Sequence, residues 1–345
     1  MTAVIAAEDA VSVGPVTARH YWPVRCGGRL SAMTQTTAAT AGTGSDRGAA
    51  EPAIDVRGLR VSYGDFEAVR GIDLDVRRGE IFALLGTNGA GKTTTLEVLE
   101  GFGTRSAGTV SVLGLDPATD RAALRTRMGV QLQEGGFVEE LTVLETLRLW
   151  QQLSDRTDRP ERLLDRFELT ARRDTGVGKL SGGEKRKLDL AMAVWGSPEL
   201  AVLDEPTTGL DPEARTRTWD AIQELQEAGR TVVLTTHYLE EAEALADRIA
   251  IMHEGRVVVS GTLAEIVATE PARFSATVAE PAGLPVLRGA VERDGARLTV
   301  RTDDLQGDLT AFLNWAAERE IRLSDLRASP ASLADIYHTI RNEER

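Results

Sequence analysis

A glycine-rich run at residues 86–94 constrains this chain more than any other feature. It follows a short apolar segment, Ile81–Leu85, and precedes a helical pattern, Thr93–Leu99. Glycines allow backbone N–H groups to converge on phosphate oxygens, and the helix N-terminus adds positive potential. We therefore predict a phosphate-binding loop in which Lys92 reaches the β- and γ-phosphates and Thr93 ligates Mg²⁺. The loop comprises Gly86, Thr87, Asn88, Gly89, Ala90, Gly91, Lys92, Thr93 and Thr94.

Two adjacent acids end a second apolar segment, Leu200–Leu203. A buried strand of a parallel sheet delivers the residues at its carboxyl end to the ligand edge. Successive strand residues point in opposite directions, so the two carboxylates can take different roles. We expect Asp204 to hold Mg²⁺, and Glu205 to act as the general base that orients the attacking water.

Short apolar runs alternate with helical patterns through most of the chain, which predicts a mostly parallel sheet covered by helices. The expected strands also include Ile54–Val56, Ile72–Val76, Thr231–Thr235 and Ile249–Met252. The stretch Thr142–Phe167 is almost wholly helical in pattern and suggests an inserted helical lobe.

The pattern changes near both ends of the chain. Residues 1–50 are rich in Ala, Thr, Gly and Ser, which is typical of a disordered extension. After about Pro271 three strands and two helices are expected, with a hairpin at Asp294-Gly295. We predict an extension at 1–50, a main domain at 51–270 with its helical lobe at about 134–195, and a small C-terminal α+β domain at 271–345.

Composition narrows the partners and the compartment. The 345 residues carry a formal charge of −13, and general nucleic-acid binders usually have a basic surface, so we expect no nucleic-acid partner. Cys26 is the single cysteine, which excludes an intrachain disulfide and fits a reducing compartment. No apolar run reaches the length of a spanning helix, so any membrane partner would be a separate chain.

The segment Leu180-Ser181-Gly182-Gly183-Glu184 resembles the signature motif of ATP-binding-cassette (ABC) ATPases. The resemblance implies that the signature of one chain contacts the γ-phosphate held by a second chain, so that ATP joins a homodimer. It implies an α/β fold, the P-loop NTPase cassette, in which antiparallel strands and a helical lobe accompany the mostly parallel sheet. The family more often has Gln where this chain has Glu184.

Further residues lie in the order that this family has. Tyr63 resembles the aromatic residue that stacks on adenine, although a strand-end tyrosine in the core is the alternative. Gln133 resembles the glutamine that senses Mg²⁺ and water at the hinge of the helical lobe, with Gln131 as a nearby rival. Asp211 lies in a segment, Gly209-Leu210-Asp211, that resembles the loop that crosses the dimer interface. His237 resembles the histidine that bridges the γ-phosphate and the base.

What the ATPase drives is left open by the cassette itself. The tail, ending in Pro330-Ala-Ser-Leu-Ala-Asp-Ile-Tyr337, resembles the extension of ATPases that serve multidrug and antibiotic exporters. We therefore expect a subunit that energises export through a separate transmembrane permease, at the cytoplasmic face of the membrane. An importer ATPase and a soluble ABC ATPase without a transport role are the alternatives. The segment 135–143 lies where family members dock on the permease.

Overall fold

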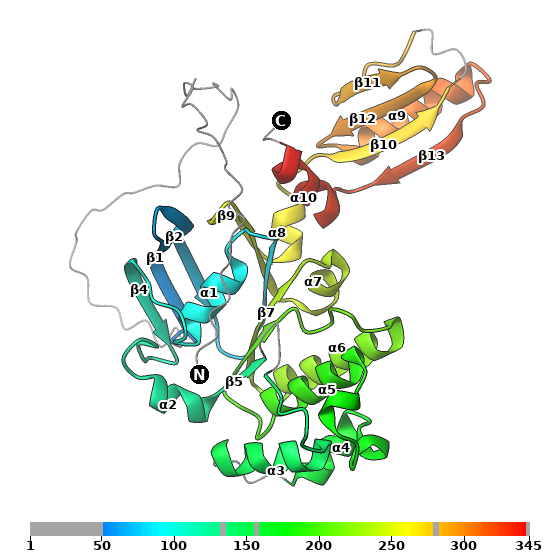
Figure 1. Ribbon diagram of the computed structural model, residues 1–345. Coiled ribbons are helices and arrows are strands. Elements are labelled where there is room, and N and C mark those ends of the chain that lie inside the picture. The colour runs from blue at the N-terminus through cyan, green and yellow to red at the C-terminus, as the bar shows by residue number, and fades with distance from the viewer. Residues whose placement is uncertain (1–50, 132–135, 155–158, 279–282, 343–345) are drawn as a thin grey trace, which may run out of the picture. The chain divides into compact units, whose positions relative to one another are not determined.

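The computed structural model describes residues 51–131, 136–154, 159–278 and 283–342 (Figure 1). The extension predicted at residues 1–50 lies outside these ranges. The main element of the described part is a six-stranded sheet in the order β5-β6-β7-β3-β8-β9, parallel except for the last strand. Its strands are β3 (Ile81–Gly86), β5 (Met128–Gln131), β6 (Leu200–Asp204), β7 (Thr231–Thr236), β8 (Arg248–His253) and β9 (Arg256–Gly261).

The inner strands of this sheet are apolar on both faces, because each face is covered. On β6, Ala201 and Leu203 pack into one core with α5, α6 and α7, whereas Leu200 and Val202 pack into the opposite core with α1. The covering helices lie on the two sides of the sheet in Figure 1. They are α1 (Lys92–Leu99), α5 (Gly182–Ala193), α6 (Pro212–Glu227) and α7 (Leu239–Leu245), and a further helix, α8, spans Leu263–Val267.

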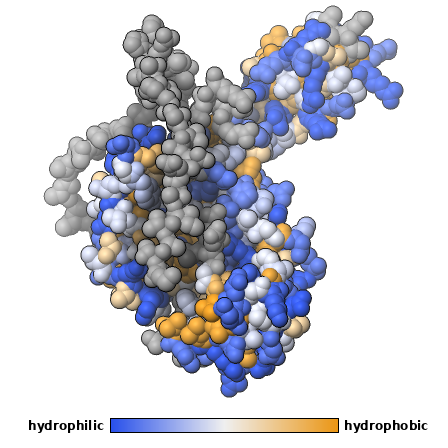
Figure 2. Space-filling view, viewed as in Figure 1, coloured by the Kyte–Doolittle hydropathy of each residue, from blue (hydrophilic) through white to orange (hydrophobic). Residues whose placement is uncertain are grey.

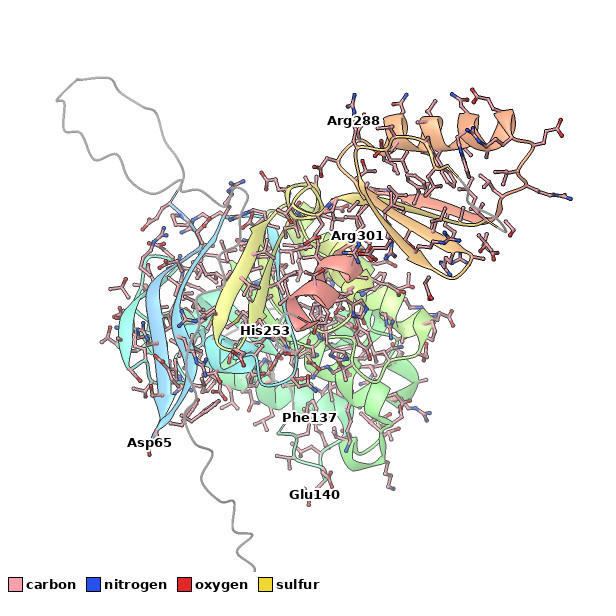
Figure 3. All side chains as sticks on the ribbon, turned by 90° about the horizontal axis from the view of Figure 1, so that it is seen from above. Asp65, Phe137, Glu140, His253, Arg288 and Arg301 are labelled. Atoms are coloured by element: carbon pink, nitrogen blue, oxygen red, sulfur yellow. The ribbon has the colours of Figure 1, made fainter. Side chains whose placement is uncertain are left out.

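A three-stranded antiparallel sheet, in the order β2-β1-β4, shares the core that contains α1. Asp65 marks the tip of its first hairpin (Figure 3). A short helix, α2 (Arg121–Arg127), contributes Leu124 to the same core. The sheet consists of β1 (Ile54–Tyr63), β2 (Phe66–Val76) and β4 (Ala107–Val112).

The helical lobe lies between β5 and β6 in the sequence. The stretch Thr142–Phe167, which the pattern predicted as almost wholly helical, contains two helices, and residues 155–158 between them lie outside the described part. The lobe is joined to the main core through the buried side chains of Val143, Leu147 and Leu164. It comprises α3 (Val143–Ser154), α4 (Pro160–Arg166), the 3-10 turns η1 (Thr170–Arg172) and η2 (Val177–Lys179), and α5.

A second antiparallel sheet, in the order β11-β12-β10-β13, follows the cassette and packs on helix α9. The predicted hairpin at Asp294-Gly295 is confirmed, since Asp294 pairs with Arg297 across the turn. Strand β13 was not predicted, because all six of its residues are exposed and show no apolar alternation. The elements are β10 (Ala272–Thr277), β11 (Ala290–Asp294), β12 (Arg297–Thr302), α9 (Leu305–Glu318) and β13 (Ser324–Ser329).

The last described helix, α10 (Leu333–Asn342), packs on the main core, and its Asp335 also forms an ion pair with Arg273 of β10 at 2.9 Å. It contacts α7, α8 and β8. Leu333 and Ile336 are buried in the core that contains α5, α6 and α7, and Tyr337 packs against that core. The second sheet, which begins at β10, is therefore followed in the chain by a helix, α10, that packs on the main core.

Candidate functional site

The glycine-rich loop connects β3 to α1, as the sequence predicted. A Cβ atom on Gly91 would lie 2.6 Å from the carbonyl oxygen of Ala68, and the φ of Gly91 is +98°, so no other residue fits there. The Lys92 ammonium donates to the carbonyls of Gly86 at 2.8 Å and Thr87 at 3.2 Å, inside the loop. Burial lowers the pKa of Lys92, while the charges of Glu205 and Asp204 oppose that shift.

The acid at the end of β6 lies beside the start of α1. Asp204 is 4% exposed, and its Oδ2 accepts a hydrogen bond from the hydroxyl of Thr93 at 3.1 Å. Its Oδ1 accepts a hydrogen bond from the hydroxyl of Thr235, on the neighbouring strand β7. A hydroxyl and a carboxylate that converge in this way are the hard oxygen ligands that Mg²⁺ prefers. The residues present therefore fit a magnesium ion.

Glu205 lies one residue beyond β6, in a backbone conformation that L-residues rarely adopt, with a φ of +48°. Its main-chain N–H donates to the carbonyl and the hydroxyl of Thr235 at 3.1 and 3.0 Å. Its carboxylate lies 3.2 Å from Nδ1 of His237 and accepts a hydrogen bond from Thr208 at 3.1 Å. The structure thus brings Glu205 and His237 together at the edge where the loop and Asp204 lie.

The signature segment begins α5, and Ser181 is its N-cap. Glu184 donates its N–H to the Ser181 hydroxyl at 3.2 Å and accepts the Ser181 N–H at 2.8 Å, which completes a capping box. Arg172 donates to the other Glu184 carboxylate oxygen at 2.6 Å. The hydrogen bond from the Ser181 backbone lowers the pKa of Glu184 most, and the one from Arg172 lowers it further. Glu184 is therefore charged at neutral pH.

The remaining predicted residues have diverse environments. Tyr63 ends β1 and is 54% exposed, which excludes the core alternative, and its hydroxyl donates to Glu97 at 3.4 Å. Asp211 is the N-cap of α6, since its carboxylate accepts the N–H of Ala214 at 2.8 Å. Gln133 lies outside the described residues. Its rival, Gln131, is 0% exposed, and neither polar atom of its side chain has a hydrogen-bond partner within the described part.

Two residues of this site escaped the sequence analysis. Arg186 donates to main-chain carbonyls at Asp204 and Glu205, and Arg172 neutralises Glu184. Arg186 belongs to the basic run 185–187, which reads as an ordinary solvated helix face. Arg172 lies in a 3-10 turn with no motif around it. Only the folded arrangement reveals either contact.

The comparisons with known proteins agree with this geometry. The model of the "ABC transporter" family matches residues 69–208, and that of the "ABC transporter domain-containing protein-like, C-terminal domain" matches residues 274–332. Daunorubicin resistance ATP-binding protein DrrA3 of Streptomyces coeruleorubidus is 36% identical over 86% of this chain and 98% of its own length. Nod factor export ATP-binding protein I of Burkholderia orbicola is 41% identical over 63% of this chain and 73% of its own.

Among solved structures, the ATP-binding subunit of an ABC transporter superposes with a TM-score of 0.60 at 32% identity. It covers 63% of this chain and 92% of the solved chain. The chain belongs to the ATP-binding subunits of ABC transporters, and it is a P-loop ATPase. The predicted fold class, an α/β ABC cassette with a smaller C-terminal domain, is confirmed.

Proposed function

We propose that this chain hydrolyses ATP as a homodimer and thereby energises export through a separate transmembrane permease. The observation that supports the chemistry best is the approach of His237 to Glu205, 3.2 Å apart, beside an Asp204–Thr93 pair at the phosphate-binding loop. The relatives named for daunorubicin resistance and for Nod factor export support the direction of transport. An importer or a soluble ATPase is not favoured by these names.

Each predicted residue takes a role that follows from its position. The loop residues and Lys92 bind the triphosphate through N–H groups and charge, and Thr93 and Asp204 hold Mg²⁺, with Gln133 as a further ligand. When bound, Mg²⁺ would supply positive charge beside the phosphates. Glu205 orients and deprotonates the attacking water, and His237 holds Glu205 in place. Catalysis of this kind rests on positioning and on stabilised charge.

The location of the signature supports the proposed dimer. Ser181 is exposed at the N-terminus of α5, where free N–H groups can bind an anion. We propose that the Ser181 hydroxyl and the backbone of the segment Ser181-Gly182-Gly183-Glu184 bind the γ-phosphate held by a second copy, with Asp211 at the same interface. Each nucleotide would then be enclosed by the phosphate-binding loop of one chain and the signature of the other.

Changing the base tests this proposal most directly. We expect Glu205→Gln to bind ATP normally, to hydrolyse it at a rate at least about 100-fold lower, and to accumulate as an ATP-bound dimer. Light scattering with Mg-ATP measures the dimer, and phosphate release measures turnover. The control is Glu227→Gln, an exposed glutamate at the end of α6. Near-normal hydrolysis by Glu205→Gln would refute the assignment.

A pocket between α2, β5, the segment that follows α1 and the helical lobe is the surface that we propose for the permease. Its volume is about 290 Å³, and Phe102, Trp150, Leu153 and Met192 line it, together with Glu100 and two arginines. Hydrophobic side chains gather around α3 in Figure 2, and Phe102 and Leu153 are more than half exposed. Exposed apolar patches of this kind mark interaction sites. The predicted segment 135–143 includes Glu140, which projects outward from the helical lobe (Figure 3).

Disrupting this pocket tests the permease assignment. We expect Leu153→Glu to abolish co-purification with the proposed permease, because a charge would replace exposed apolar surface. A matched control is Leu313→Glu on α9, which is 39% exposed and lies outside the pocket. The partner gene should encode about six apolar helices of roughly 20 residues each. Equal recovery of the partner by both variants would contradict the proposed surface.

The membrane association and the domain division remain part of this proposal. Within the described ranges, no helix is both long enough and apolar enough to cross a bilayer. We infer that the permease holds the chain at the cytoplasmic face of the membrane. We propose that residues 51–270, with the helical lobe at about 134–195, form the ATPase unit and that residues 271–345 form an accessory unit, whose last described helix, α10, packs on the ATPase unit. We propose a drug, an antibiotic, a lipid or a similar molecule as the substrate; the relatives' names concern daunorubicin resistance and Nod factor export.

A further inference from the structure

Arg186 makes a contact that the chemistry proposed above does not use. It lies on α5, one helical turn beyond the signature serine, and its side chain is 10% exposed. Its guanidinium donates to three successive main-chain carbonyls, those of Asp204, Glu205 at 2.5 Å and Pro206 at 3.3 Å. The planar fork of a guanidinium suits such a multiple contact, whereas a lysine ammonium is a single point. Arg186 thus connects the signature helix to the loop that carries both acids.

A second charge lies near this guanidinium. Asp189, further along α5, lies 3.7 Å from Arg186, and its side chain is 13% exposed. Burial raises the pKa of Asp189 to about 6, although the neighbouring Arg186 charge lowers it in part. At neutral pH the pair is therefore ionised and buried. A buried charge is tolerated where a partner and hydrogen bonds compensate it, and the three carbonyls and Asp189 do so for Arg186.

The backbone that Arg186 contacts is strained. Glu205 has a φ of +48°, a backbone conformation that is unfavourable for a residue with a side chain. On one side, its N–H is held by Thr235 on β7. On the other side, its carbonyl is held by Arg186. Because the direction of the Glu205 side chain depends on this φ, both contacts determine where its carboxylate points.

We propose that Arg186 is a positioning residue for ATP hydrolysis: by holding the carbonyls of residues 204–206, it keeps the Glu205 carboxylate beside His237. The inference rests on Glu205 being the base. It also gives the signature helix a direct connection to the base of the same chain. A shift of α5, on contact with the nucleotide of the second copy, would move the carbonyl of Glu205 with it.

The test compares substitutions at Arg186 in the full chain. Arg186→Gln removes the charge and most of the donors. Because the base would then be misplaced, we expect kcat to fall about 10–100-fold, while the KM for ATP stays within about threefold of the wild-type value. Arg186→Lys keeps a charge facing Asp189 but cannot span three carbonyls, so kcat should fall roughly 3–10-fold. The control is Arg166→Met, since Arg166 on α4 also donates to a carbonyl, that of Ala221, and to Glu224.

Two further measurements separate positioning from folding and from the chemistry itself. The double variant Glu205→Gln/Arg186→Gln should still form an ATP-dependent dimer, which a merely structural role for Arg186 would not allow. If the double variant does not fold, the Arg186→Lys variant alone decides the matter. Wild-type kcat in Arg186→Lys and Arg186→Gln, or a rise in KM equal to the fall in kcat, would overturn the inference. Near-normal hydrolysis by Glu205→Gln would instead refute the base.

Discussion

The Nε–H of Arg172 donates to a carboxylate oxygen of Glu184 at 2.6 Å. Glu184 belongs to the signature, which we propose binds the γ-phosphate held by a second copy. A carboxylate at such a place would repel a triphosphate. The ion pair balances that charge while the capping box keeps the carboxylate directed at the backbone N–H of Ser181. The structure therefore explains how an acid is accommodated at a position where glutamine is commoner in the family.

This relationship predicts a charge-dependent effect at the signature. Replacing Arg172 with glutamine should weaken ATP-dependent dimerisation about two- to fivefold, since a partly exposed ion pair is worth at most about 1 kcal/mol. In a Glu184→Gln background, the same replacement should have no effect. Dimerisation followed by light scattering, at low and high salt, checks both statements, and the effect should shrink at high salt. An equal loss in both backgrounds would mean that Arg172 acts by packing alone.

Glu100 predicts a pH dependence of stability. The residue ends α1 and is 3% exposed, and burial, with the charges of Asp204 and Glu97, raises its pKa to about 8 from 4.5. Between pH 4.5 and about 8, the folded chain holds a proton on Glu100 that the unfolded chain has released. Glu100 therefore lowers the stability of the folded chain progressively as pH rises through this range. Glu100→Gln should raise the free energy of unfolding by a few kcal/mol at about pH 9, and much less at about pH 5. Urea unfolding at both pH values measures the difference. A constant offset would contradict the shifted pKa.

The adenine contact can be assigned between two aromatic residues. Tyr63 and Phe66 pair across the turn of the first hairpin, and they are 54% and 60% exposed. Tyr63→Ala should weaken ATP binding by about 1–3 kcal/mol if its ring stacks on the base. Tyr63→Phe should bind normally, because the ring carries the stacking. Titration calorimetry with ATP measures each variant, and a larger loss in Phe66→Ala would move the assignment to Phe66.

Close packing between β5 and α5 predicts a sharp effect on stability. A Cβ atom on Gly129 would lie 1.8 Å from the carbonyl oxygen of Ala193, so the strand and helix could not keep their separation. Gly129→Ala should lower the free energy of unfolding by about 1–3 kcal/mol or more. Gly136→Ala is the control, since nothing lies within 4 Å of its added Cβ. Urea denaturation compares the two, and equal stability would show that the backbone relaxes freely.

The sequence predicted the cassette well because its elements carry local signals. The phosphate-binding loop, the two acids at the end of β6 and the signature at 180–184 are each a short run of consecutive residues, so each can be identified from local sequence. The contacts of Arg186 and Arg172 join segments that are 18 and 12 residues apart, and neither has a pattern of its own. Strand β13 lacks apolar alternation, and only pairing with β10 makes it a strand.

The position of α10 alters how the C-terminal part should be regarded. Because Leu333 and Ile336 are buried among residues of α5, α6 and α7, the second sheet is anchored to the ATPase unit at its exit as well as at its entrance. The second sheet is therefore connected to the ATPase unit at two points of the chain and not at one. Truncation before residue 333 would expose the apolar surface of the ATPase unit that α10 covers. Removing the accessory sheet without exposing that surface requires deleting the residues between α8 and α10 and joining these two helices directly.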